Sequence, residues 1–185
     1  MKHYAIEKII EVPENTTASL TPVRGGKTVQ IKGPKGELVR TFKQLKVQLF
    51  FIDNKFVIQS FFGNKAEASM VGTIAGHLTN MIKGVTEGFT YKVRVITSHF
   101  PATVEIQEQE QLIYVKNLYG RRDPIRIPFD KSVKITVKGD MVTMTGIDIE
   151  KVSQAAARLA EATRLRGRRS KDPTVFQDGL YVVYP

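Results

Sequence analysis

Apolar and polar residues alternate in several short runs along the first half of the chain, which predicts β-strands with one buried face. Turn residues separate these runs: Gly33-Pro34-Lys35-Gly36 follows one run directly, and Asp53-Asn54 follows another. The chain should therefore reverse its direction at each turn, so that neighbouring strands run antiparallel. The expected strands are residues 4–12, 28–32, 37–42, 47–52 and 56–60.

A helix is predicted after the last of these strands, because the apolar period changes from two residues to about 3.6. Asn64 can cap its N-terminus, and Glu67 stands where a carboxylate can bond back to the capping residue. Gly84 is expected to end the helix in a left-handed conformation. The apolar face consists of Met70, Val71, Ile74, Leu78, Met81 and Ile82.

The second half of the chain repeats this order of elements. Asp148 can cap a second helix, which is expected to end near Gly167. The two capping residues, Asn64 and Asp148, lie 84 residues apart, which indicates an internal duplication. The expected strands are residues 89–96, 102–106, 112–115, 133–137 and 141–145, and the apolar helix face is Val152, Ala155, Ala156 and Leu159.

The repeated pattern predicts an α+β fold made of two tandem copies of a small antiparallel sheet with one helix packed on it. We expect the first domain to span residues 1–88 and the second to span residues 89–185. The linker should be short, because the strand at 89–96 follows the first helix directly.

The composition adds a strong positive charge, since 28 Lys and Arg residues against 18 Asp and Glu residues give a net charge of +10. Such an excess repels itself in a compact fold, so we favour a polyanionic partner over charge that is spread for solubility. Each half carries +5 when the chain is divided after Thr90. Only local clustering of basic residues can therefore locate the binding surface.

Other features of the composition exclude several classes of protein. There are no cysteines, which excludes disulfides, thiolate zinc sites and a cysteine nucleophile. The N-terminal segment lacks the apolar core of a signal peptide, and no apolar run approaches the roughly 20 residues needed to cross a bilayer. We expect a soluble, intracellular protein with no membrane partner.

Catalytic and metal-binding chemistry find no support in the sequence. The three histidines, His3, His77 and His99, have no second histidine or carboxylate at ligand spacing. Gly26-Lys27-Thr28 looks like the end of a nucleotide-binding P-loop, but the first glycine of that motif is missing and a strand follows instead of a helix. We therefore expect no catalytic residues, no metal, no cofactor and no small-molecule substrate.

The sharpest local cluster of charge lies at the predicted end of the second helix. From Arg164 to Lys171, five of eight residues are basic and none is acidic. Cations there also complement the helix dipole, which explains part of the cluster. Four of the five are arginines, whose guanidinium groups bind phosphate oxygens at two points, so we predict an anion site. A second cluster, Arg121-Arg122 beside Tyr119, is a weaker candidate because Asp123 follows it.

Longer motifs occur throughout the chain. Residues 80–92 read Asn-Met-Ile-Lys-Gly-Val-Thr-Glu-Gly-Phe-Thr-Tyr-Lys, and Ser98-His99-Phe100-Pro101 follows. Thr145-Gly146-Ile147-Asp148 and the ending Phe176-Gln177-Asp178-Gly179-Leu180-Tyr181-Val182 complete the set. Together these motifs resemble the large-subunit ribosomal protein six family in its archaeal and eukaryotic form. The resemblance covers nearly the whole chain and departs from the family pattern at Asn117–Asp123.

This resemblance implies a structural role in the large ribosomal subunit, in the cytoplasm. It also implies binding to 23S-type rRNA near the sarcin–ricin loop, mainly through the second domain, with other large-subunit proteins and translation factors nearby. The alternatives are a free regulatory RNA- or DNA-binding protein and, less favoured, an enzyme. The candidate RNA-binding residues are Arg164, Arg166, Arg168, Arg169, Lys171, Gln177, Arg121, Arg122, Lys83 and Asn80.

Overall fold

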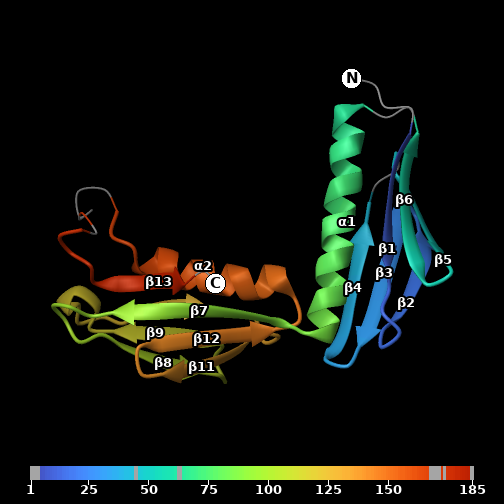
Figure 1. Cartoon of the computed structure of the whole chain (residues 1–185). Coiled ribbons are helices and arrows are strands. Elements are labelled where there is room, and N and C mark those ends of the chain that lie inside the picture. The colour runs from blue at the N-terminus through green and yellow to red at the C-terminus, as the bar shows by residue number, and fades with distance from the viewer. Residues whose placement is uncertain (1–4, 44–45, 62–63, 167–171, 173, 184–185) are drawn as a thin grey trace. The chain divides into compact units, whose positions relative to one another are not determined.

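The computed structural model describes residues 5–43, 46–61, 64–166, 172 and 174–183. The chain divides into two compact units, Met1–Gly88 and Phe89–Pro185. In each unit one α-helix packs on antiparallel strands (Figure 1), which confirms the predicted α+β class and its two copies.

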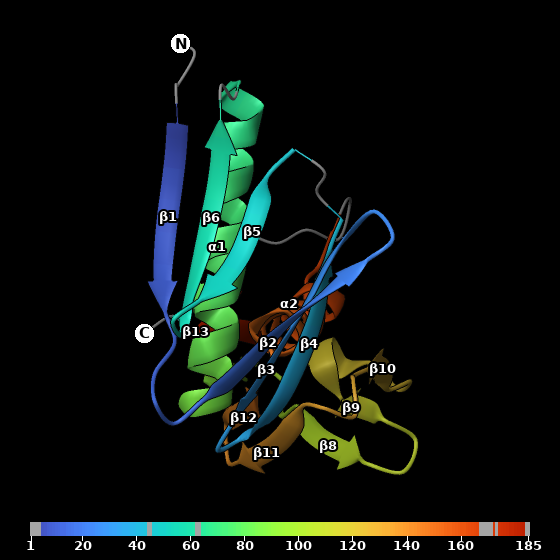
Figure 2. The ribbon, with the colours of Figure 1, turned by 90° about the vertical axis from the view of Figure 1, so that its right-hand side faces the viewer.

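The strands of the first unit form two sheets instead of the expected one. Both sheets have three antiparallel strands, in the orders β1-β6-β5 and β2-β3-β4. Figure 2 shows both of them, and α1 contacts strands of each. The strands are β1 (Ala5–Glu11), β2 (Thr17–Val23), β3 (Gly26–Gly33), β4 (Gly36–Phe42), β5 (Gln48–Ile52) and β6 (Lys55–Phe61), and the helix is α1 (Lys65–Thr86).

The sequence pattern did not predict β2. Pro22 lies within it and its side chains are exposed or half-buried, so the strand lacks both a clear apolar face and a full set of backbone donors. Proline is tolerated in this position because β2 is at the edge of its sheet.

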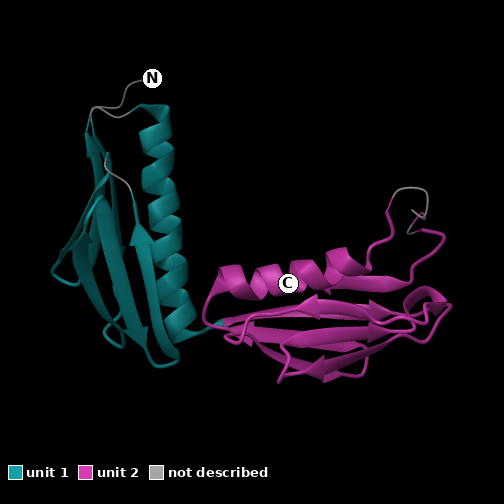
Figure 3. Cartoon of the chain, turned by 180° about the vertical axis from the view of Figure 1, so that it is seen from behind, with its two compact units in different colours: residues 1–88 teal, residues 89–185 magenta. Residues whose placement is uncertain are grey.

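The second unit, magenta in Figure 3, also has two antiparallel sheets, in the orders β11-β12-β7-β13 and β10-β9-β8. The short strand β10 and the last strand β13 were not expected from the sequence. The strands are β7 (Phe89–Ile96), β8 (Thr103–Gln107), β9 (Leu112–Lys116), β10 (Ile125–Pro128), β11 (Lys134–Lys138), β12 (Met141–Gly146) and β13 (Gly179–Val183). The helices are the 3-10 turn η1 (Leu118–Gly120) and α2 (Ile149–Thr163).

The predicted N-caps of both α-helices are correct. The backbone N–H of Asn64 donates to the Glu67 carboxylate over 3.1 Å, which is the bond expected of a capping box. The carboxylate of Asp148 accepts from the backbone N–H of Glu150 over 2.9 Å. These bonds satisfy donors that a helix start would otherwise leave without partners.

The predicted helix ends are not correct. Gly84 is buried inside α1, which continues to Thr86, and the left-handed residue is Gly88 with φ of 74°. The helix extends beyond Gly84 because Val85 still belongs to its buried face. The second helix, α2, ends at Thr163, after which Arg164 has an extended conformation. The expected end near Gly167 lies outside the described residues.

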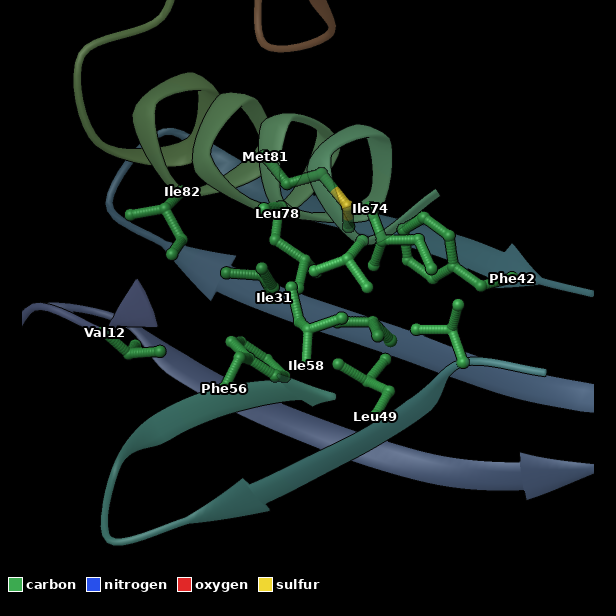
Figure 4. Close-up of a cluster of buried hydrophobic side chains, with 14 of the residues drawn as sticks. Val12, Ile31, Phe42, Leu49, Phe56, Ile58, Ile74, Leu78, Met81 and Ile82 are labelled. Atoms are coloured by element: carbon green, nitrogen blue, oxygen red, sulfur yellow. The ribbon is translucent and has the colours of Figure 1, made fainter. Parts of the chain in front are cut away.

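The core of the first unit is a continuous apolar cluster between α1 and the two sheets (Figure 4). Ile31, Phe56, Ile58 and Leu78 are fully buried within it. Burial of each such side chain contributes roughly 1.5–3 kcal/mol. The hairpin between β3 and β4 is held against the end of α1, because the backbone N–H of Lys35 donates to the carbonyl of Val85 over 3.0 Å.

Candidate nucleic-acid interface

Two of the arginines predicted to bind RNA, Arg164 and Arg166, lie directly after the end of α2. The inner face of α2, which includes Val152, Ala156 and Leu159, is fully buried against the second unit's strands. This packing fixes the axis of the helix, so its last turn has a defined position. Arg164 and Arg166 follow that turn and are both exposed.

Arg166 has an acidic partner that the sequence argument did not include. Its guanidinium group donates to the carboxylate of Glu161, five residues earlier. Both side chains are about two-thirds exposed, at 64% and 68%, so solvent screens the pair and its contribution to stability is small. The arginine is therefore oriented by this contact but is accessible to a stronger anion.

Two further arginines, Arg126 and Arg158, line the same pocket as Arg164 and Arg166. Arg126 lies on β10 and Arg158 on α2, and both are exposed. The pocket has a volume of about 560 Å³. Sequence reasoning missed both residues, since each is an isolated arginine and β10 itself was not predicted. The arginine cluster is thus wider than the run in the sequence suggests.

A buried carboxylate fixes the far end of the segment that follows α2. The side chain of Asp178 is 1% exposed and accepts from the backbone N–H groups of Ser98, His99 and Phe100 over 2.8, 3.1 and 3.1 Å. The ring nitrogen Nδ1 of His99 lies 3.1 Å from the same carboxylate. Burial acts to raise the pKa of Asp178, but the bonds from His99 and the backbone amides outweigh it, so the pKa lies below its usual value.

Tyr119 connects the two ends of that segment. Its hydroxyl lies 2.8 Å from the carbonyl oxygen of Thr163, at the end of α2, and 3.0 Å from that of Asp178. Burial is the main cause that raises the pKa of Tyr119 above its usual value. The sequence indicates only an aromatic residue beside two arginines, whereas in the structure the Tyr119 hydroxyl bonds to backbone carbonyls inside the protein.

Aromatic rings pack against one another around Asp178 and Tyr119. The ring of His99 stacks on Phe176 with centroids 4.8 Å apart and planes inclined by 14°. The ring of Tyr119 is tilted by 35° to that of Phe176, with 5.8 Å between the centroids. Phe176, Tyr119 and Tyr181 also line a second pocket of about 560 Å³, with Arg164 at its wall. The arginine-bearing end of α2 therefore adjoins an aromatic surface.

The remaining candidates are distributed over the molecule. Gln177 is half-buried, and its side-chain amide donates to the carbonyl of Thr174 over 2.7 Å, within the same loop. Arg121 and Arg122 are exposed between η1 and β10 and are not among the residues that line the arginine pocket.

On the first unit, Lys83 is exposed and Asn80 is half-buried, and both lie on α1. Arg168, Arg169 and Lys171 lie outside the described residues. Most of the predicted RNA-binding residues that the structure describes therefore belong to the second unit.

No group of three or more His, Asp or Glu side chains among the residues that the structure describes is placed to hold a metal ion. Neither α-helix in that part of the chain combines the length and hydropathy that a membrane span requires.

The fold and the arginine pocket describe a basic, two-unit α+β protein whose second unit presents a cluster of exposed arginines. A family model described as ribosomal protein L6 matches residues 12–88. A large ribosomal subunit protein uL6 from Staphylothermus marinus is 39% identical over 94% of this chain and 91% of its own length. The uL6 protein of Methanobrevibacter smithii is 38% identical over 97% and 96%, and that of Aeropyrum pernix is 39% identical over 97% and 93%.

The chain belongs to the ribosomal protein L6 family. This membership confirms the family that the sequence motifs resembled, including its archaeal form. It also decides against the enzyme reading, because the members of this family are structural proteins of the ribosome.

Proposed function

We propose that the second unit binds 23S-type rRNA near the sarcin–ricin loop, at the factor-binding region of the large ribosomal subunit. As a family member the chain is a protein of the large subunit, and so it belongs to the cytoplasmic ribosome. Its partners are rRNA and neighbouring large-subunit proteins, with translation factors nearby. The sarcin–ricin location follows from what the sequence motifs imply for the family.

One observation carries the proposal: Arg164 and Arg166 are exposed directly after the last turn of α2, which is held by the buried face of the helix and by Tyr119. The Tyr119 hydroxyl links Thr163 to Asp178, and buried Asp178 is bonded to three backbone amides. Side chains on a fixed frame lose little freedom when they bind, so their contacts retain more of the binding energy. Arginine on such a frame suits recognition of a folded RNA by its shape and backbone.

The proposal is tested by changing Arg166, Arg168 and Arg169 together to alanine. We expect a folded protein whose rRNA affinity depends less on salt, since each lost phosphate contact lowers the slope of log affinity against log salt by about 0.7–0.9. Incorporation into large subunits should be poor, as measured by co-sedimentation in a sucrose gradient.

A matched control removes the same charge from the same unit by changing Lys131, Lys134 and Lys138 to alanine, which are all exposed. This control should incorporate normally. Equal incorporation of both variants would contradict the proposed contact surface. Binding to mRNA or DNA with no association with large subunits would instead support a free regulatory nucleic-acid-binding protein.

A further inference from the structure

The pocket at the end of α2 brings together four guanidinium groups and one carboxylate. Arg158 and Glu161 come from α2, Arg164 and Arg166 from the residues just after it, and Arg126 from β10. Arginines 32 to 40 residues apart in the sequence thus converge on one cavity. The excess of positive charge in so small a space repels itself unless an anion enters it.

The positions of these side chains follow from the secondary structure around them. On α2, Arg158, Glu161 and Ala162 are spaced by three and four residues, so they lie on one face of the helix. On β10, Ile127 is buried and anchors the strand, while Arg126 is exposed and lies over the ring of Tyr114 with 5.9 Å between guanidinium carbon and ring centroid. Ile127, Pro128 and Ala162 supply an apolar wall.

The carboxylate of Glu161 already binds one of the pocket's arginines, so it would compete with any anion that enters the pocket. This carboxylate accepts from Arg166 and lines the pocket with the other three arginines. A phosphodiester offers two oxygens and one negative charge, as a carboxylate does, and matches the fork of a guanidinium group equally well. Because the Glu161–Arg166 pair is largely exposed, an incoming phosphate can displace the carboxylate at little expense.

We propose that this pocket is a binding site for a backbone phosphate of RNA, that Arg126 and Arg158 contact that phosphate together with Arg164, and that Glu161 competes with it for Arg166. The inference rests on the proposed function, because the RNA that supplies the phosphate is the rRNA of the large subunit. It adds two binding residues from outside the basic run and one acidic residue that opposes binding.

The test measures binding of the full chain to protein-free large-subunit rRNA over a series of salt concentrations. The paired variant Arg126→Gln with Arg158→Gln should lose about tenfold in affinity, and its salt slope should fall by about 0.7–0.9, the value for one phosphate. Glu161→Gln should bind about threefold to tenfold more tightly, a change that misfolding cannot produce. The control pair Arg24→Gln with Arg94→Gln removes the same charge from exposed positions and should change affinity less than threefold.

Each contrary result has a distinct meaning. If the paired variant binds like the control pair, or if Glu161→Gln does not bind more tightly, the pocket is not the phosphate site, although the proposed function stands. If the unaltered protein does not prefer large-subunit rRNA to unrelated RNA, the proposed function itself fails. Inorganic phosphate, titrated against the arginine side-chain NMR signals, identifies a free-anion site. Phosphate binding with unchanged rRNA affinity in the paired variant would overturn the RNA proposal.

Discussion

Replacement of Asp178 by asparagine should destabilise the second unit by about 2–4 kcal/mol, although it changes hardly any volume. The carboxylate is buried, and its two oxygens accept from four N–H groups. In the variant one oxygen becomes an NH₂ group. If that group replaces Oδ2 it faces the N–H of Phe100, and if it replaces Oδ1 it faces the N–H of Ser98.

Either orientation leaves at least one of these part-buried N–H donors facing an NH₂ group instead of an acceptor, and removes a charge from the remaining bonds. An unsatisfied buried donor costs about 1–3 kcal/mol, and a hydrogen bond to a charged group contributes about 1.5–3 kcal/mol. Part of the lost stabilisation is regained, because the asparagine side chain retains one oxygen that accepts hydrogen bonds. The expected loss of 2–4 kcal/mol follows from these two terms.

Tyrosine fluorescence during urea unfolding measures this loss in the second unit. The chain has no tryptophan, and five of its six tyrosines follow residue 88, so the signal comes mainly from the second unit. His99→Ala is the control, since its ring is 47% exposed and makes one bond to the carboxylate, and it should cost about 1 kcal/mol or less. A loss below about 0.5 kcal/mol for Asp178→Asn would refute the reasoning.

Two other outcomes follow from the structure. The pKa of Asp178 lies below its ordinary value of 3.8, so the stability that its ionised form contributes is present above that pH and is lost as the pH falls through the folded-state pKa. Urea midpoints in acid should therefore decline less steeply for Asp178→Asn than for the unaltered protein, and parallel declines would contradict this. Gly33→Ala should destabilise the first unit by about 1–3 kcal/mol in far-ultraviolet circular dichroism, because its Cβ would lie 2.7 Å from the carbonyl oxygen of Val85. Gly76→Ala, which meets no atom within 4 Å, should be neutral or stabilise by up to about 1 kcal/mol, and equal effects of the two changes would count against the close contact.

Local signals in the sequence account for most of the fold. The caps at Asn64 and Asp148 are bonds between residues two or three positions apart, so the sequence contains all the information that they need. The strands with alternating apolar residues were likewise predicted from their own pattern. Strand β13 could not be, because it is a strand only through pairing with β7, more than 80 residues earlier.

The candidate site was predicted less completely than the fold. Arg164 and Arg166 were found because they belong to a dense run, whereas Arg126 is isolated in the sequence and reaches the pocket only through tertiary packing. The Glu161–Arg166 pair was not predicted, because the basic run from Arg164 to Lys171 contains no acidic residue and Glu161 lies before it. Asp178 belongs to a family motif, but no residue near it in the sequence indicates that the amides of residues 98–100 converge on its carboxylate.

Crosslinking of this protein to RNA in intact cells, followed by sequencing of the attached RNA, tests the central claim most directly. The account predicts that crosslinks concentrate in the rRNA of the large subunit around the sarcin–ricin loop, and that the attached peptides come from the segment between Thr163 and Asp178. Crosslinks that fall mainly on messenger RNA, or on rRNA through the first unit alone, would contradict it.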